Sequence, residues 1–173
     1  MRRGLRLLVG CLLVGLCARG ASLPVDDVWK LLKGTAQPSA GWNTADFDDS
    51  KWLEEEAPCG YGYPSIATVL ADMRWNYSSV YFRLPFDLED TYGIARLSLT
   101  IDWDDGFVAY LNGQYLAHRN MPISFDPPYV VLASPPHLAG RPEVFVLDAF
   151  TPALRAGMNV LAVQVHNASK SDE

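Results

Sequence analysis

The run from Ile101 to Gly113, which reads IDWDDGFVAYLNG, constrains the fold more than any other stretch of the chain. Asp105-Gly106 and Asn112-Gly113 are dipeptides that supply the positive φ angles of tight turns between antiparallel strands. Residues 97–103 alternate apolar with polar side chains, which is the period of a strand that buries one face. The sequence therefore predicts three antiparallel strands that fold back on one another here. The residues expected to face the core are Ile101, Trp103, Phe107, Ala109 and Leu111.

Short strand-like runs recur along the rest of the chain, and no long helical pattern separates them. A single helical turn is expected at Phe150–Arg155, because Thr151-Pro152 opens it and Gly157 closes it. A length of 173 residues is enough for one all-β domain with its own core. The count and spacing predict an all-β fold, a β-sandwich of antiparallel strands. The other predicted strands are Val28–Leu32, Val80–Leu88, Gln114–Ala117, Glu143–Leu147 and Leu161–His166.

The first residues have the pattern of a secretory signal peptide. Three arginines (Arg2, Arg3 and Arg6) precede an apolar run over Leu5–Leu16, which is short for a membrane span. Ala18-Arg19-Gly20 places small residues at the two positions that signal peptidase reads. The sequence therefore predicts a signal peptide over residues 1–20 and one domain over residues 21–173. The mature protein is expected to be extracellular or periplasmic, with no membrane contact after cleavage.

Charge and cysteine content restrict the partners of the mature domain. Cleavage after Gly20 leaves 10 basic and 20 acidic residues, a net charge of −10. Such a charge disfavours nucleic acid and anionic membranes, and it is compatible with neutral ligands such as sugars or with bound cations. Cys11 and Cys17 leave with the signal peptide, so Cys59 can form no internal disulfide. We expect Cys59 to be a small buried hydrophobic residue.

The sequence has no catalytic pattern, and we expect the chain not to be an enzyme. His118, His137 and His166 are far apart, and none belongs to a metal-binding motif of paired histidines. Asp102, Asp104 and Asp105 form the only dense group of reactive side chains. Our preferred interpretation is that these aspartates bind backbone N–H groups in a turn. A calcium site and an acid/base pair acting on a glycoside are the alternatives, and calcium is the only cofactor considered.

Aromatic residues in loops are the candidate ligand contacts. Tyr61 and Tyr63 lie in a Gly- and Pro-rich loop, and Trp75 and Tyr77 follow in an irregular segment. Their flat faces could stack on sugar rings, and packing over an edge of the core is the alternative. The run 42–52 places Phe47 and Trp52 among carboxylates; we interpret it as a turn that anchors two aromatic side chains in the core, with a cation site as the alternative.

Seven motifs in order along the chain resemble a known family. They are Lys33-Gly34-Thr35, Phe47–Trp52, Ala57–Gly62, Tyr81–Phe86, Asp104–Gly113, Arg119–Pro122 and Gly157–Asn167. The chain resembles the galactose-binding-domain-like jelly-roll modules of large secreted bacterial multidomain proteins, which are related in fold to the sugar-binding domain of β-galactosidase-type glycosidases. The resemblance implies a jelly-roll sandwich and a noncatalytic accessory role, with carbohydrate and the neighbouring domains of a longer polypeptide as partners. In the family a further strand follows, whereas this chain stops at residue 173. The alternatives are a truncated module that lacks its last strand and a last strand supplied from elsewhere.

Three functions remain open on sequence grounds. The first is a secreted module that binds carbohydrate or mediates another interaction. The second is an N-terminal fragment of a secreted glycosidase or other hydrolase whose catalytic domain lies beyond the end of this chain. The third is a purely structural domain with no ligand.

Overall fold

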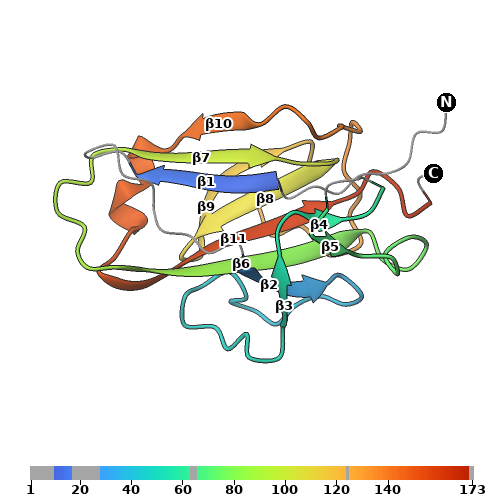
Figure 1. Cartoon of the computed structure of the whole chain (residues 1–173), viewed down its shortest axis with the longest axis horizontal. Coiled ribbons are helices and arrows are strands. Elements are labelled where there is room, and N and C mark those ends of the chain that lie inside the picture. Colours follow the sequence, from blue (N-terminus) through green and yellow to red (C-terminus); the bar gives the residue numbers. More distant parts are fainter. Residues whose placement is uncertain (1–9, 17–27, 63–65, 124, 172–173) are drawn as a thin grey trace.

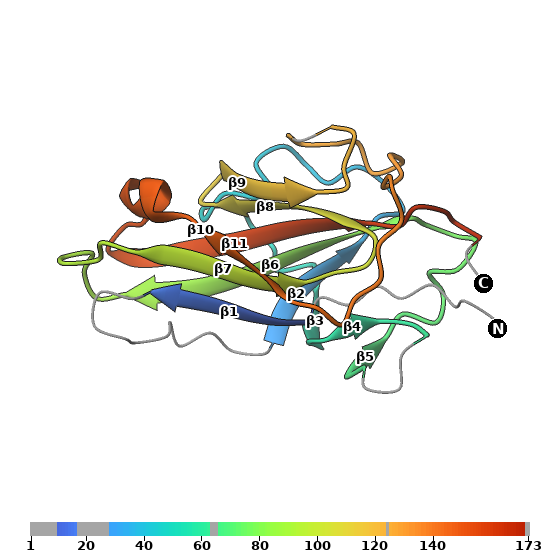
Figure 2. The same ribbon diagram turned by 90° about the horizontal axis from the view of Figure 1, so that it is seen from above.

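The computed structural model describes residues 10–16, 28–62, 66–123 and 125–171, and these form an antiparallel β-sandwich. A six-stranded sheet has the strand order β3-β2-β6-β11-β8-β9, and a three-stranded sheet has the order β1-β7-β10 (Figures 1 and 2). The strands of the larger sheet are β2 Val28–Lys33, β3 Leu53–Glu56, β6 Ser79–Leu88, β8 Gly106–Leu111, β9 Gln114–Arg119 and β11 Gly157–His166. Those of the smaller sheet are β1 Gly10–Leu16, β7 Leu97–Asp102 and β10 Glu143–Val146.

The remaining elements are short. β4 (Cys59–Gly60) and β5 (Thr68–Val69) pair in parallel, and the 3₁₀ helix η1 (Asp148–Ala153) lies where the sequence predicts a helical turn. Among the described residues, no helix has the length and apolar character needed to cross a membrane. The all-β sandwich is confirmed; its jelly-roll connectivity stays a prediction.

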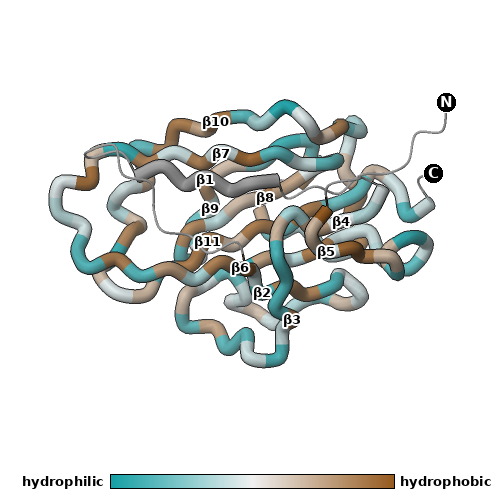
Figure 3. Tube along the Cα trace, in the orientation of Figure 1, coloured by the Kyte–Doolittle hydropathy of each residue, from teal (hydrophilic) through white to brown (hydrophobic). Residues whose placement is uncertain are grey.

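The main core lies between the two sheets and follows the predicted alternation. Every second residue of β6 from Val80 to Phe86 is buried, and so are Leu97, Leu99 and Ile101 of β7. The five side chains between Ile101 and Leu111 that the sequence expects to face the core belong to the same cluster. Hydrophobic residues gather along the strands, while the connecting loops are more hydrophilic (Figure 3). Burial of these apolar faces is the principal driving force of the fold.

The opposite face of the six-stranded sheet is also covered. Tyr81 of β6, Val108 and Tyr110 of β8, and Ala162 of β11 form a second buried cluster. The loops after β2 and after β9 pack over this face, on the side away from the three-stranded sheet (Figure 2). The central strands are therefore buried on both faces, and all six residues of β8 are buried. The alternation in the sequence predicts only the first of these two interfaces.

The two predicted turns differ in outcome. Asn112 (φ 51°) and Gly113 (φ 85°) have the positive φ angles of a tight hairpin turn, and they join β8 to β9 as predicted. The hairpin predicted at Asp105-Gly106 is wrong, because β7 pairs with β1 and β10 while β8 pairs with β11 and β9. This segment crosses from one sheet to the other. Gly106 is needed for close packing, since a Cβ atom there would lie 2.8 Å from Cβ of Ala133.

Strand β1 lies in the segment predicted to be a signal peptide. Gly10–Leu16 pairs antiparallel with β7, with a register shift between Gly10 and Leu13. The rest of that predicted leader, residues 1–9 and 17–20, lies outside the described residues. Cleavage of the leader and the 21–173 boundary stay predictions, and the pairing of β1 is considered further below.

Candidate functional site

A buried arginine organises the loop between β2 and β3. Arg83 projects from β6 away from the main core and is 2% exposed. Its Nε donates to Oδ2 of Asp49 at 2.7 Å, and Nη1 donates to the carbonyl oxygens of Trp42 and Thr44. Nη2 donates to the carbonyl of Phe47. Because hydrogen bonds from an ionised donor are stronger than neutral ones, this one side chain fixes the path of the loop.

Aromatic side chains of the same loop pack in layers on the sheet. Trp42 is buried and meets Tyr81 and Tyr110 edge to face, with ring centroids 4.9 and 5.6 Å apart. Trp52 stacks on Trp42 with centroids 6.3 Å apart, and Phe47 meets the edge of Trp52 at 5.8 Å. Such pairs contribute beyond the area they bury. Trp42 is thus the anchor, while Phe47 and Trp52 stay half-buried at the surface.

An open hollow of about 580 Å³ is lined in part by these two side chains. Its lining residues are Ser39, Ala40, Gly41, Thr44, Asp46, Phe47, Asp48, Lys51 and Trp52. Asp46, Asp48 and Lys51 are exposed on its rim. The Ser50 hydroxyl and N–H donate to Asp48 and hold the pKa of that carboxyl below its usual range. The hollow therefore combines aromatic side chains with a carboxylate that stays ionised well into the acidic range.

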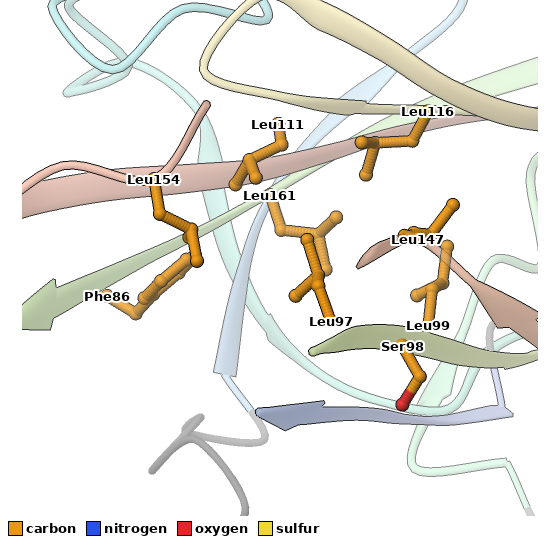
Figure 4. Close-up of a pocket in the computed structure, with 9 residues that line it drawn as sticks. All are labelled: Phe86, Leu97, Ser98, Leu99, Leu111, Leu116, Leu147, Leu154 and Leu161. Atoms are coloured by element: carbon orange, nitrogen blue, oxygen red, sulfur yellow. The ribbon is translucent and has the colours of Figure 1, made fainter. Parts of the chain in front are cut away.

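A second space, among the described residues inside the sandwich, is far smaller than the hollow. A crevice between β7 and β11 has a volume of only about 10 Å³ (Figure 4). Its walls are seven leucines with Phe86 and Ser98. A volume of this size is about that of one water molecule, so this crevice cannot hold a sugar. A sugar ring fits the volume of the surface hollow but does not fit this crevice.

The predicted stacking residues do not share one surface. Trp75 is 62% exposed, and the guanidinium carbon of Arg74 lies 5.8 Å from its ring centroid. Tyr77 is 2% exposed and donates its hydroxyl to Oδ1 of Asp72, so its ring face is not open to solvent. Tyr61 is half-buried against the main core. Tyr63 lies outside the described residues. Of the three described candidates, Trp75 is exposed, Tyr61 is half-buried and Tyr77 is buried.

The acidic cluster binds backbone groups from distant segments. Both carboxylate oxygens of Asp102 accept the N–H of Gly140, at 2.9 and 2.8 Å. Asp105 accepts the N–H of His137 at 2.9 Å and that of Ala168 at 2.7 Å. Asp104 is fully buried beside them. In the part of the chain that the structure describes, no three acidic, histidine or cysteine side chains are arranged to hold a metal ion. A calcium role for Asp102, Asp104 and Asp105 stays a prediction.

The histidines occupy three separate structural positions. Nδ1 of His118 lies 2.6 Å from the hydroxyl of Tyr115. His137 stacks on Trp103 with ring centroids 4.5 Å apart, and its Nδ1 donates to the Trp103 carbonyl. His166 is fully buried. The expectation that the chain is not an enzyme stays a prediction.

Cys59 is buried, as expected from the sequence. Burial raises the pKa of its thiol to about 12. Because the thiolate is the reactive form, a thiol with this pKa is inert near neutral pH. Cys59 therefore serves as a packing residue.

His166 makes the stability of the fold depend on pH. Its Nδ1 lies 2.6 Å from the carbonyl of Val131, which can only accept, so the neutral ring carries its proton on Nδ1. Burial lowers the pKa of His166 from 6.5 to about 4. As the pH falls, the imidazole of the unfolded chain binds a proton at a higher pH than His166 does in the folded protein. The His166 contribution to the free energy of unfolding is therefore fully present above pH 6.5. It falls by at most about 3 kcal/mol as the pH drops toward 4.

Urea unfolding at pH 7.5, 6.0, 5.0 and 4.5 measures this effect. In His166→Gln, which keeps a polar side chain at this position, we expect the part of the pH dependence due to His166 to disappear. An unchanged slope between pH 6.5 and 4.5 in this variant would show that other groups carry the dependence.

The fold and the hollow together define an antiparallel β-sandwich with an open aromatic surface site. Comparisons with protein-family models and with curated proteins find no match. Among solved structures, the chain is similar to Bifidobacterium dentium β-glucuronidase, solved in complex with coumarin-3-O-glucuronide, with a TM-score of 0.48 and 18% identity. The match covers 95% of this chain and 21% of that chain, so the chain spans about a fifth of the enzyme's length.

The sequence interpretation of the 42–52 run was correct in part and incomplete in part. Phe47 and Trp52 pack against the second cluster, as predicted, but they stay half-buried at the surface, and Trp42 is the residue that anchors the loop in the core. The sequence interpretation did not identify the hollow above them. No local signal locates it, because Arg83 is a charged residue at a position that the strand pattern assigns to the surface, and only the structure shows that it is buried.

Proposed function

We propose that this chain is a secreted, noncatalytic module that binds neutral carbohydrate in the hollow over Phe47 and Trp52. The observation that carries the proposal is the combination of two half-buried aromatic rings with ionised and hydroxyl-bearing side chains around one open space. Sugars present both apolar C–H faces and hydroxyl groups. Aromatic rings match the first, and carboxylates, hydroxyls and ammonium groups match the second.

The site is preorganised, which favours binding. Arg83 fixes the backbone of Trp42, Thr44 and Phe47 from below, so this loop loses little freedom when a ligand arrives. Thr44 Oγ1 also donates to the carbonyl of Gly41 at 2.8 Å. An open hollow on a fixed loop suits an accessory module that holds a chain end or a single ring of a longer glycan.

The charge of the hollow predicts which sugars it selects. Asp46 and Asp48 contribute two carboxylates to the lining and Lys51 contributes one cation. Arg155 lies near Asp46, with 3.7 Å between Nη2 and Oδ1, and both side chains are largely exposed. A uronic acid would bring a third carboxylate toward the two on the rim, so we expect neutral hexosides to bind better than uronides.

The direct test is a glycan array followed by tryptophan-fluorescence titration with the neutral oligosaccharides that bind. We expect Trp52→Ala to weaken binding by about tenfold or more, a change equivalent to about 1.4 kcal/mol, because the stacking surface is lost. Asp48→Ala combined with Lys51→Ala removes only exposed rim groups. This second variant should weaken binding several-fold while leaving the melting temperature nearly unchanged.

Trp75→Ala is the matched control, because Trp75 is an exposed tryptophan outside the lining of the hollow. Its affinity should stay within twofold of the unaltered protein. A loss confined to Trp75→Ala would place the sugar site at the loop before β6 instead. Absence of binding to every neutral glycan on the array would contradict the proposal.

A further inference from the structure

The three-stranded sheet depends on a strand from the predicted leader. Gly10–Leu16 lies along one edge of β7, and β10 lies along the other (Figure 1). The paired positions include Leu13 with Thr100 and Gly15 with Ser98. If the leader is removed, β7 keeps only β10, a strand of four residues. The backbone N–H and C=O groups on that edge of β7 then lose their partners.

A sheet edge with unpaired backbone groups tends to pair with another strand. A two-stranded ribbon is marginally stable in water, and a free edge is a template for pairing with another strand. The inner face of β7 is part of the main core, where Leu97, Leu99 and Ile101 are all nearly or fully buried. Any opening of this sheet would therefore expose apolar surface as well as backbone groups. Figure 4 shows β7 below the leucine side chains that line the crevice, with Ser98 on the opposite side of β7.

The sequence of the occupant defines its chemistry. Gly10–Leu16 reads GCLLVGL and carries no charged side chain. It pairs through its backbone at five positions of β7 between Leu97 and Asp102. The edge thus receives an extended, uncharged, mostly apolar segment, the type of ligand that adds a strand to a sheet through main-chain hydrogen bonds.

We propose that the free edge of β7 is a strand-acceptor site, which Gly10–Leu16 occupies in the precursor and which leader removal opens to an extended apolar segment of the same kind. The site is separate from the sugar hollow, which lies on the loop between β2 and β3. The precursor and the processed module therefore differ at one sheet edge. In the precursor this edge is occupied, and in the mature module it is an interaction surface.

Disulfide trapping in the uncleaved full chain tests the first part. In a Cys11→Ser, Cys17→Ser background, the matched pairs are Leu13→Cys with Thr100→Cys and Gly15→Cys with Ser98→Cys. The control pairs are Leu13→Cys with Ser98→Cys and Gly15→Cys with Thr100→Cys, in which the two cysteines are offset by two residues from the observed register. Opposed residues of antiparallel strands have Cα atoms close enough for a disulfide, whereas offset pairs are too far apart. We expect the matched pairs to cross-link at least about tenfold faster, as measured by intact mass and peptide mapping. Equal rates in all four variants would overturn the proposal.

Cleavage after folding tests the second part. A protease site placed after Gly20 in the full chain is cut, and a labelled peptide of residues 10–16 with a lysine tag is added. We expect the label to bind only after cutting, and a peptide methylated on alternate backbone nitrogens not to bind, because it lacks the N–H donors of a strand. Loss of the folded circular dichroism spectrum on release of the leader, reversed by the peptide, would also support the site. Release of the leader with an unchanged spectrum and no peptide binding would overturn it.

Discussion

Replacement of Arg83 by methionine is expected to lower the free energy of unfolding by about 3–5 kcal/mol, because it leaves buried partners of a charged group uncompensated. Arg83 is 2% exposed, and Asp49, its ion-pair partner, has a side chain that is 19% exposed. Without the guanidinium, Asp49 loses its counter-charge, and the carbonyls of Trp42, Thr44 and Phe47 lose their donors. Methionine fills most of the volume but supplies no donor.

Chemical denaturation of Arg83→Met measures this loss, and Arg119→Met is the matched control. Arg119 also forms an ion pair, with Glu143, but its side chain is 44% exposed. Exposed pairs contribute little, so the control should lose no more than about 1 kcal/mol. Arg83→Lys keeps the positive charge, but a lysine ammonium lacks the planar guanidinium that donates to several acceptors at once. We expect the stability loss of Arg83→Lys to lie between those of Arg83→Met and Arg119→Met. Equal losses in Arg83→Met and Arg119→Met would contradict the view that Arg83 organises the loop.

Arg83→Lys separates the effect of Arg83 on stability from its effect on ligand binding. Because Arg83 holds the loop that carries Phe47 and Trp52, a folded Arg83→Lys protein should bind neutral sugars more weakly than the unaltered protein. Arg83 lies beneath the rings, with its guanidinium carbon 5.2 Å from the ring centroid of Phe47 and 6.0 Å from that of Trp52. It acts as a positioning residue. Unchanged affinity in Arg83→Lys would indicate that the loop keeps its path without the guanidinium.

The strands could be predicted from the sequence because their signals are local. The alternation over residues 97–103 and the Asn112-Gly113 turn each depend on neighbouring residues only, and the structure confirms both. Period-two patterning reports which side chains share a face of a strand. It does not report what covers that face. This is why the sandwich was predictable and the coverage of its outer face was not.

The candidate site could not be predicted because long-range contacts create it. Tyr81 and Arg83 occupy positions that alternation assigns to solvent, yet loops about 35 or more residues distant in sequence cover them. Asp105-Gly106 has the dipeptide sequence typical of a hairpin turn. Glycine is required at position 106 for a different reason, because Met121 and Ala133 approach too closely to leave space for a Cβ atom. A dipeptide rule cannot distinguish a glycine selected for φ from one selected for space. Only the tertiary packing separates the two.

Replacement of Asp105 by alanine is expected to lower the free energy of unfolding by about 2–4 kcal/mol, because two backbone donors lose their acceptor. Asp105 is 2% exposed, and its carboxylate joins the N–H groups of His137 and Ala168, which belong to different loops. Asp105→Asn keeps one carbonyl oxygen, so it should lose less than Asp105→Ala. Asp90→Ala is the matched control, because Asp90 accepts a single N–H, that of Tyr92, in an exposed turn.

The same measurements decide between the backbone role and the calcium role of the acidic cluster. If Asp105 acts by binding backbone N–H groups, the loss in Asp105→Ala is the same in calcium and in a chelator. If Asp102, Asp104 and Asp105 hold calcium, the unaltered protein is stabilised by added calcium, since a ligand that binds only the native state raises its stability. That stabilisation would then disappear in Asp105→Ala. The buried carboxylates and their backbone donors lead us to expect the first result, with thermal unfolding curves that superimpose in the two buffers.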